Sequence, residues 1–305
     1  MRRVGFATLL AVGLVTAASA QVKLELKFPE GEKRTVVETT RVAQTLTIAG
    51  MNVETRAEGA STTEVAYGAR RPDGNQPITE TIKHVKLRLE VPGSEVDFDS
   101  DKPAPAVGGP LDQVIESLKA SKGVSYTILL SPQNKVAGVE GLDKVVQNLP
   151  PAVAESLKSE YSPEKVKQAA EQAYSVLPAE PVKKGDRWSR TEVMNLGAGQ
   201  QFVLEAFYEY EGPVEKGGKT LDRIAYSVGS VKYQLEPNSP LPLQVANSDL
   251  KIDSSGGAIL IDRERGAVVE RTSKMRVIGP MTFDVMGMQI PGKLDVTIES
   301  TRVPK

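Results

Sequence analysis

Alternation of apolar and charged side chains is the sequence pattern that most constrains the fold of this chain. Residues 22–28, VKLELKF, and residues 84–91, HVKLRLEV, both place an apolar residue at every second position. A period of two puts neighbouring side chains on opposite faces of a β-strand. Strands with one apolar and one polar face are typical of antiparallel sheets that bury a single face. The chain is therefore expected to build a large antiparallel sheet with one face covered.

Helical spacing interrupts these strands in the middle of the chain. Apolar residues at positions i, i+3 and i+4 predict a helix over 110–122, and the same spacing recurs at 142–149. Ser162 followed by Pro163 indicates a helix N-cap with proline at the first helical position. We therefore predict the α+β class: a large, curved, half-barrel-like antiparallel sheet with helices packed on one face.

Two short stretches suggest that the chain consists of two related halves. GEKRTVVE at 31–38 is similar to GDRWSRTE at 185–192, and each is a Gly-acid turn before a strand. Turn chemistry shared by all antiparallel sheets explains the same similarity. IAGMNV at 48–53 also resembles VMGMQI at 285–290, and both look like hairpin tips, either because they lie on neighbouring strands of one wrapped sheet or by chance. The predicted organisation is a signal peptide over 1–20, a first β-rich half over 21–140 with an inserted helix, a helical bridge over 141–178, and a second β-rich half over 179–305.

The N-terminus has the three parts of a secretory signal peptide. Arg2 and Arg3 precede a short apolar run, and Ala18-Ser19-Ala20 forms a small-x-small cleavage site. The apolar run is shorter than the roughly 20 residues of a spanning helix, so a membrane anchor is the less favoured interpretation. We expect an exported, periplasmic or secreted, soluble protein without a transmembrane anchor after cleavage.

Composition excludes several classes of function. The chain has no Cys, which rules out disulfides, thiol catalysis and cysteine zinc sites. It has 38 Lys and Arg against 39 Asp and Glu, and aromatic residues make up 5% of it. No basic block with interleaved aromatics occurs, so a nucleic-acid partner is not expected.

The candidate catalytic and metal patterns are incomplete. His84 is the single histidine, so a two-histidine metal site is excluded. Ser162 to Lys165 matches SxxK without its partner motifs, and helix capping explains Ser162 better. Asp97, Asp99 and Asp101 resemble the start of a calcium loop, but the later glycine and glutamate of that pattern are missing. We expect no enzyme activity, no metal and no cofactor.

Methionine and other apolar residues concentrate near the C-terminus. Among them are Met275, Met281, Phe283, Val285, Met286, Met288 and Ile290, and methionine fills irregular apolar space, including ligand surfaces. One hypothesis is a ligand cavity between helices and sheet, and the other is ordinary core packing. The candidate lining residues are Leu111, Ile115, Leu118, Met281 and Phe283.

The chain resembles a family of uncharacterised exported bacterial proteins that carry a domain of unknown function. The resemblance rests on Phe98-Asp99-Ser100 with Pro103, on Leu177-Pro178, and on Val182 with Gly185-Asp186 and Trp188. At the level of architecture, it is also similar to the half-barrels that carry lipids or lipoproteins across the periplasm. That similarity implies a binding or carrier protein for an apolar ligand or lipidated partner. The alternative is a structural or protein-interaction module of the cell envelope.

Overall fold

Long antiparallel strands make up most of the molecule. The computed structural model describes residues 21–305 except 106–107, 148, 198, 237–243 and 286. Within these residues a single 13-stranded sheet is present. In chain order the strands are β1 (Lys33–Ile48), β2 (Met51–Tyr67), β3 (Gln76–Val91), β4 (Ser94–Asp99), β5 (Ser125–Leu130), β6 (Val136–Glu140), β7 (Arg187–Gly197), β8 (Gln200–Lys216), β9 (Lys219–Leu235), β10 (Gln244–Ser248), β11 (Lys251–Asp262), β12 (Ala267–Val285) and β13 (Met288–Pro304).

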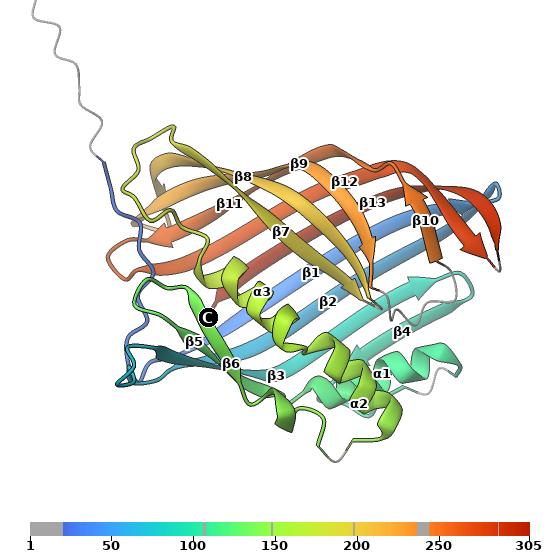
Figure 1. Ribbon diagram of the computed structural model, residues 1–305, viewed down its shortest axis with the longest axis horizontal. Helices are drawn as coiled ribbons and strands as arrows, with labels where there is room; N and C mark the ends of the chain where they lie inside the picture. The colour runs from blue at the N-terminus through green and yellow to red at the C-terminus, as the bar shows by residue number, and fades with distance from the viewer. Residues whose placement is uncertain (1–20, 106–107, 148, 198, 237–243, 286) are drawn as a thin grey trace, which may run out of the picture.

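The first and last strands of the chain meet in the middle of the sheet. The order is β6-β5-β3-β2-β1-β13-β12-β11-β9-β8-β7, with β4 paired to β3 and β10 paired to β12. β1 pairs with β13 from Val36 opposite Pro304 to Ile48 opposite Gly292. Figure 1 shows that the sheet is strongly curved and that β7 and β8 lie in front of its central strands. The concave face is therefore largely enclosed by the sheet itself.

Helices form a minor layer, so the predicted α+β class is wrong and the protein is mostly β. The helices are α1 (Pro110–Ser121), α2 (Pro151–Glu160) and α3 (Pro163–Tyr174), with a 3-10 turn, η1 (Leu142–Lys144). The spacing at 142–149 therefore produced one short turn in place of a helix. The largest core cluster is formed almost entirely by strand residues of β7–β13, because these long strands bury one face against each other. The large antiparallel sheet itself is confirmed.

Helix α3 crosses the open side of the curved sheet and is hydrogen-bonded to one strand on each side of the opening, β3 and β7. Ser162 caps its N-terminus by accepting a hydrogen bond from the Lys165 amide, as predicted from the Ser-Pro pair. Tyr174 at its other end donates to Glu80 of β3. Gln172 donates to the Val193 carbonyl of β7 at 3.1 Å. The helix therefore ties β3 to β7 across the opening (Figure 1).

The alternating segment at 22–28 buries one face without joining the sheet as a strand. Leu24 and Leu26 are buried, as their period of two predicts. Its only strand-like pairing within the described chain is an isolated bridge between Val22 and Val182. The Lys27 amide also bonds the Gly266 carbonyl at 2.8 Å. The segment thus closes one end of the concave core.

The two turns that suggested a duplication make matching hydrogen bonds. The Gly31 amide bonds the Tyr67 carbonyl, and the Tyr67 amide bonds the Glu32 carbonyl. In the same way Gly185 bonds Tyr210, and Tyr210 bonds Asp186. Both glycines have positive φ, 78° and 91°, which glycine adopts without strain. The division into two related halves stays a prediction. These matching hydrogen bonds are the structural similarity between the two turns.

The expected hairpin tips are present and lie on adjacent strands. Residues 48–53 turn between β1 and β2, and Val285 at the end of β12 pairs with Met288 at the start of β13. Because β1 pairs with β13, the two tips project from the same end of the sheet (Figure 1). The signal peptide predicted for residues 1–20 lies outside the described residues. Among the described helices, none is long and apolar enough to cross a bilayer.

Candidate functional site

A gradient of polarity runs along the concave face of the two central strands. Register alternation places one cross-strand row on this face. From the hairpin end, the pairs of that row are Leu46 opposite Leu294, Gln44 opposite Val296, Val42 opposite Ile298, Thr40 opposite Ser300, and Glu38 opposite Arg302. Apart from Gln44, the row is therefore apolar near the hairpins, then hydroxylated, then charged at Glu38 and Arg302, and the last pair, Val36 opposite Pro304, is apolar again.

A cavity of about 400 Å³ lies over the apolar and hydroxylated part of this row. Its volume is in the range of about 300–1,000 Å³ that is typical of small-molecule sites. One wall comes from β1, β12 and β13, and the opposite wall comes from β7, β8, β9 and β10. Val42, Phe202 and Val296 contribute apolar surface, and Phe202 and Val296 are almost fully buried. The cavity is thus enclosed by the curvature of the sheet.

The structure does not bring the five predicted lining residues together. Met281 and Phe283 of β12 line the cavity at its hairpin end. Leu111, Ile115 and Leu118 of α1 instead pack in a separate cluster over β3 and β4, with Phe98 at its centre. The helices therefore do not form the wall that the sequence suggested, because β7–β9 fold over the central strands and occupy that position.

A smaller cavity of about 90 Å³ continues the row beyond Arg302. It is lined by Arg34, Arg271 and Arg302, together with apolar and aromatic side chains. Arg34 bonds Glu32 at 2.6 Å, and Arg271 bonds both carboxylate oxygens of Glu192 at 3.3 Å. Two of the three arginines are therefore paired with a carboxylate.

Arg302 and Glu38 differ from these pairs. They are directly opposite one another on β13 and β1, and both are partly buried. Among the described residues, neither side chain has a hydrogen-bond or ion-pair partner. Burial alone would lower the pKa of Arg302, but nearby Glu80 and Glu38 outweigh burial and raise it. A charged, incompletely partnered pair therefore marks the polar end of the large cavity.

Glu80 is held by two tyrosines beside this pair. The Tyr126 hydroxyl donates to Glu80 at 2.9 Å, and Tyr174 donates to its other oxygen. Burial is the main cause that raises the pKa of both phenols, and the nearby carboxylate adds to it. The tyrosines therefore stay protonated, and Glu80 stays an acceptor within the fold.

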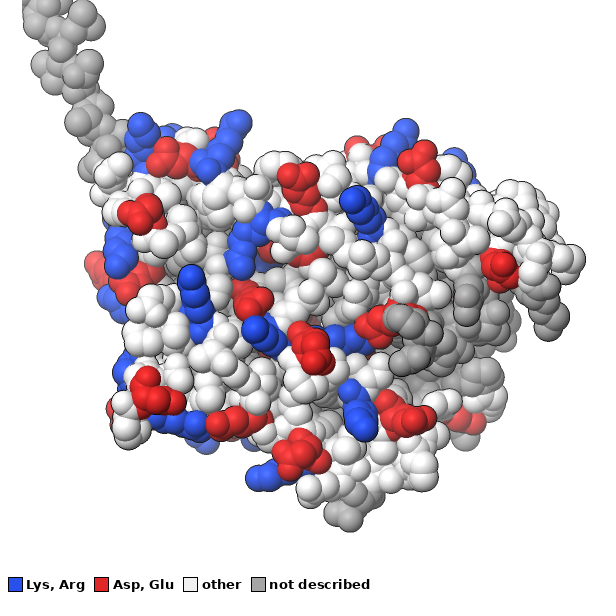
Figure 2. Space-filling view, in the orientation of Figure 1, with Lys and Arg blue, Asp and Glu red and all other residues white. Residues whose placement is uncertain are grey.

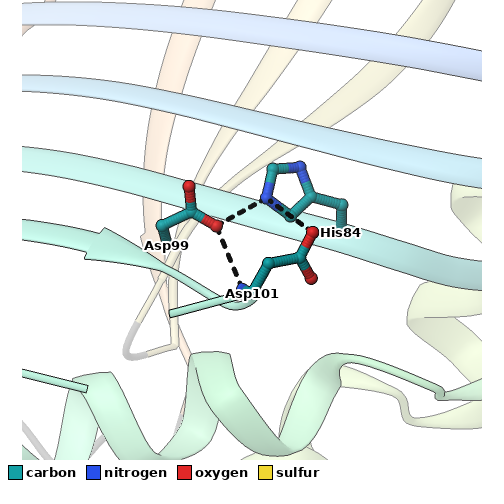
Figure 3. Close-up of side chains that lie close together, drawn as sticks. All are labelled: His84, Asp99 and Asp101. Carbon is teal, nitrogen blue, oxygen red and sulfur yellow. Dashed lines mark hydrogen bonds and ion pairs between the residues drawn. The ribbon is translucent and has the colours of Figure 1, made fainter. Parts of the chain in front are cut away.

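His84, Asp99 and Asp101 form the one described group with metal-ligand geometry, and Figure 3 shows them converging. His84 Nε2 lies 2.7 Å from Asp99 and 3.6 Å from Asp101. The same carboxylates contact three lysine ammonium groups: Lys86 and Lys102 contact Asp99, and Lys122 contacts Asp101 at 2.6 Å. The hydrogen bond from His84 is the largest cause that lowers the pKa of Asp99. This cluster is better explained as an ion-pair network that holds the end of β4, and the residues that follow it, against β3 than as a cation site.

Sequence reasoning missed the polar end of the large cavity, namely Glu38, Thr40 and Ser300, and Arg302 beside it in the smaller cavity. The signal was present in alternate residues of 34–48, which change from charged to apolar, and in 294–304, which change in the reverse direction. Recognising it required knowing that β1 and β13 pair. The resemblance of the two hairpin tips was the one hint of that pairing.

Three solved structures that match the chain have low similarity scores. A chain of lipovitellin, studied for its lipid–protein interactions, has a TM-score of 0.48 at 11% identity, with 92% of this chain and 25% of that chain covered. The chain thus spans a quarter of the length of that protein. An outer membrane channel from Pseudomonas putida F1 has a TM-score of 0.25 at 10% identity, covering 92% of this chain and 98% of the channel. DynF of the dynemicin pathway of Micromonospora chersina has a TM-score of 0.20 at 9% identity, covering 97% and 92%. These scores are too low to indicate a common fold.

Sequence comparison is more specific. No curated protein matches the chain. One family model does match, over a segment that runs from the β2–β3 turn into β8 and includes the helices. The predicted resemblance to an uncharacterised family is thereby confirmed for that segment: residues 73–209 match the family of unknown function DUF6263.

Proposed function

We propose that this protein binds an apolar ligand in the cavity between its central strands and β7–β10, without catalysis. The observation that carries the proposal is the cavity of about 400 Å³ on the concave face. Well-packed cores leave few voids larger than a water molecule. A space of this size, lined largely by apolar side chains, therefore suits a ligand better than it suits a packed core.

The compartment is part of the proposal. The pattern of residues 1–20 supports export to the periplasm or beyond, where an apolar molecule needs a carrier to cross water. Figure 2 shows Lys, Arg, Asp and Glu interspersed over one face of the molecule. This mixed surface fits a protein that carries its apolar cargo inside.

Filling the cavity tests the proposal. Val42→Trp places an indole in the cavity, whereas Ala43→Trp places one on the exposed face of the same strand. We expect Val42→Trp to weaken binding of the neutral apolar dye Nile red about tenfold, a loss of about 1.4 kcal/mol. Ala43→Trp is the control and should bind like the unmodified protein. Equal affinity of all three proteins, or no copurifying apolar molecule in mass spectrometry, would contradict the proposal.

A protein-interaction module is the second candidate, because one end of the sheet exposes apolar side chains. Met51 is 70% exposed and Met288 is 63% exposed, and both belong to the adjacent hairpin tips. Exposed apolar groups at one site are typical of contact surfaces. A photo-cross-linker at Met288 that recovers no protein in cells would count against this candidate.

A further inference from the structure

Three amide side chains, Gln44, Asn195 and Gln200, also line the large cavity, but the charged and hydroxyl-bearing side chains that β1 and β13 contribute all lie at one end of it. This asymmetry bears on the chemistry of the ligand. Leu46, Leu294 and Phe283 lie at the hairpin end, whereas Thr40 and Ser300 lie at the opposite end. Resting on the proposed function, we infer that the ligand is a single-chain amphiphile whose uncharged, hydroxyl- or amide-bearing headgroup lies between Glu38 and Arg302.

The position of the headgroup follows from the register. Ser300 lines the cavity, and Arg302 is two residues further along the same strand, about 7 Å away. Glu38 is opposite Arg302 and lines the cavity itself. A polar atom at this end of the cavity is therefore within reach of a carboxylate acceptor, two hydroxyls and a guanidinium donor.

The bonding capacity of the two charged groups selects a headgroup that both donates and accepts. A carboxylate only accepts hydrogen bonds and a guanidinium only donates them. Glu38 and Arg302 leave that capacity unused among the described residues. A ligand hydroxyl or amide would donate to Glu38 and accept from Arg302, which satisfies both groups and compensates the cost of their burial.

The charge balance disfavours an anionic headgroup. Glu32 and Glu192 pair with Arg34 and Arg271, so these arginines are already compensated. Arg302 remains, and two carboxylates act on it, those of Glu80 and Glu38. The surroundings of Arg302 therefore carry a net negative charge, and a second anion there would be repelled where the dielectric screening is weak.

Competition between two ligands with the same acyl chain tests the inference. Monolauroylglycerol is uncharged, and laurate is its anionic counterpart at mildly alkaline pH. We expect monolauroylglycerol to displace Nile red at a concentration about tenfold lower than laurate, because about 1.4 kcal/mol of repulsion corresponds to that ratio. Glu38→Gln should reduce the difference between the displacing concentrations of the two ligands, because it improves laurate binding. Glu54→Gln makes the same charge change on the exposed outer face of β2 and should leave the ratio unchanged.

Each other outcome has a separate meaning. Laurate that competes as well as monolauroylglycerol would overturn the headgroup inference and leave apolar binding intact. Nile red binding that neither amphiphile displaces would overturn the amphiphile inference alone. Absence of Nile red binding would overturn the proposed function itself. If the Glu38→Gln variant fails to fold, the concentrations at which the two ligands displace Nile red from the unmodified protein still test the headgroup inference.

Discussion

At the scale of single residues, buried or partly buried carboxylates that accept hydrogen bonds from tyrosine hydroxyls recur through the core. Glu80 accepts from Tyr126 and Tyr174, Glu192 accepts from Tyr208 and Tyr226, and Asp222 accepts from Tyr210. A buried charge is costly unless it is hydrogen-bonded. These phenols therefore make it possible to hold acidic side chains in a core that is otherwise apolar.

Removing one tyrosine hydroxyl measures how much such a hydrogen bond stabilises the fold. Tyr174→Phe deletes the hydrogen bond to Glu80 from the residue that ends α3. Because hydrogen bonds to charged groups contribute about 1.5–3 kcal/mol, we expect the free energy of unfolding to fall by about 2 kcal/mol. Urea unfolding followed by circular dichroism gives the value.

Tyr161→Phe is the matched control for this change. The Tyr161 hydroxyl has no hydrogen-bond partner among the described residues. Its loss should change the free energy of unfolding by less than about 0.5 kcal/mol. Similar losses in the two variants would show that the bond to Glu80 contributes nothing.

At the scale of elements, close approach of β11 and β12 depends on one glycine. A Cβ at Gly257 would lie 2.2 Å from the Thr272 carbonyl oxygen and 2.9 Å from the Ser273 Cα, both of which are backbone atoms. A Cβ at the preceding Gly256 would meet no atom within 4 Å. The two glycines are neighbours in one strand and differ in the space around them.

Alanine substitution at the two positions should therefore give opposite results. Gly257→Ala has to separate β11 from β12, and we expect it to lower the free energy of unfolding by about 2 kcal/mol or more. Gly256→Ala should be neutral or slightly stabilising, because alanine restricts the unfolded chain. Denaturant midpoints and hydrogen exchange of the β11 and β12 amides measure the difference. Equal midpoints would contradict the predicted clash.

Individual elements were readable from the sequence wherever the signal is local. Ser162 and Pro163 predicted the start of α3, and alternation predicted the buried faces at 22–28 and 84–91. The apolar spacing at 142–149 predicted a helix, whereas the structure has the 3-10 turn Leu142–Lys144, because a few apolar residues at helical spacing do not stabilise so short a helix. The α+β class failed because it gave three short helices the same weight as thirteen strands, most of them long.

The candidate site was harder to predict from the sequence than single elements were, because it depends on the pairing of strands that are far apart in the chain. Phe283 was singled out for its neighbouring methionines, and it does line the cavity. Ile115 was singled out for its helical spacing, yet it packs against β3 and β4 on another part of the sheet. No local pattern states that β1 lies beside β13, and only that pairing brings Glu38 opposite Arg302.

At the scale of the whole molecule, every one of the eight tyrosines has a raised pKa, with burial as the main cause. Burial raises the pKa of Tyr233 to about 12 from an ordinary value near 10. Above pH 10 the unfolded chain loses phenol protons that the folded chain keeps. The folded state then binds more protons, so stability falls as pH rises.

Alkaline titration tests this expectation. We expect the free energy of unfolding to be constant below about pH 10 and to decrease between about pH 10 and 12. Tyrosinate absorbance should rise together with the loss of circular dichroism, because the phenols ionise as the core opens. Tyrosinate that forms near pH 10 in a chain with intact circular dichroism would contradict the burial of these side chains.

Helix α3 also affects whether two molecules of the protein can associate through the β7 edge of the sheet. β7 ends the sheet, and an end strand offers backbone groups with which another chain can pair. Gln172 of α3 donates to the Val193 carbonyl of β7, and the Trp188 indole at the start of β7 donates to the Val176 carbonyl. A second molecule that adds a strand here has to displace α3 and break these bonds. The helix that crosses the opening of the sheet therefore also protects the β7 edge against strand addition by another molecule.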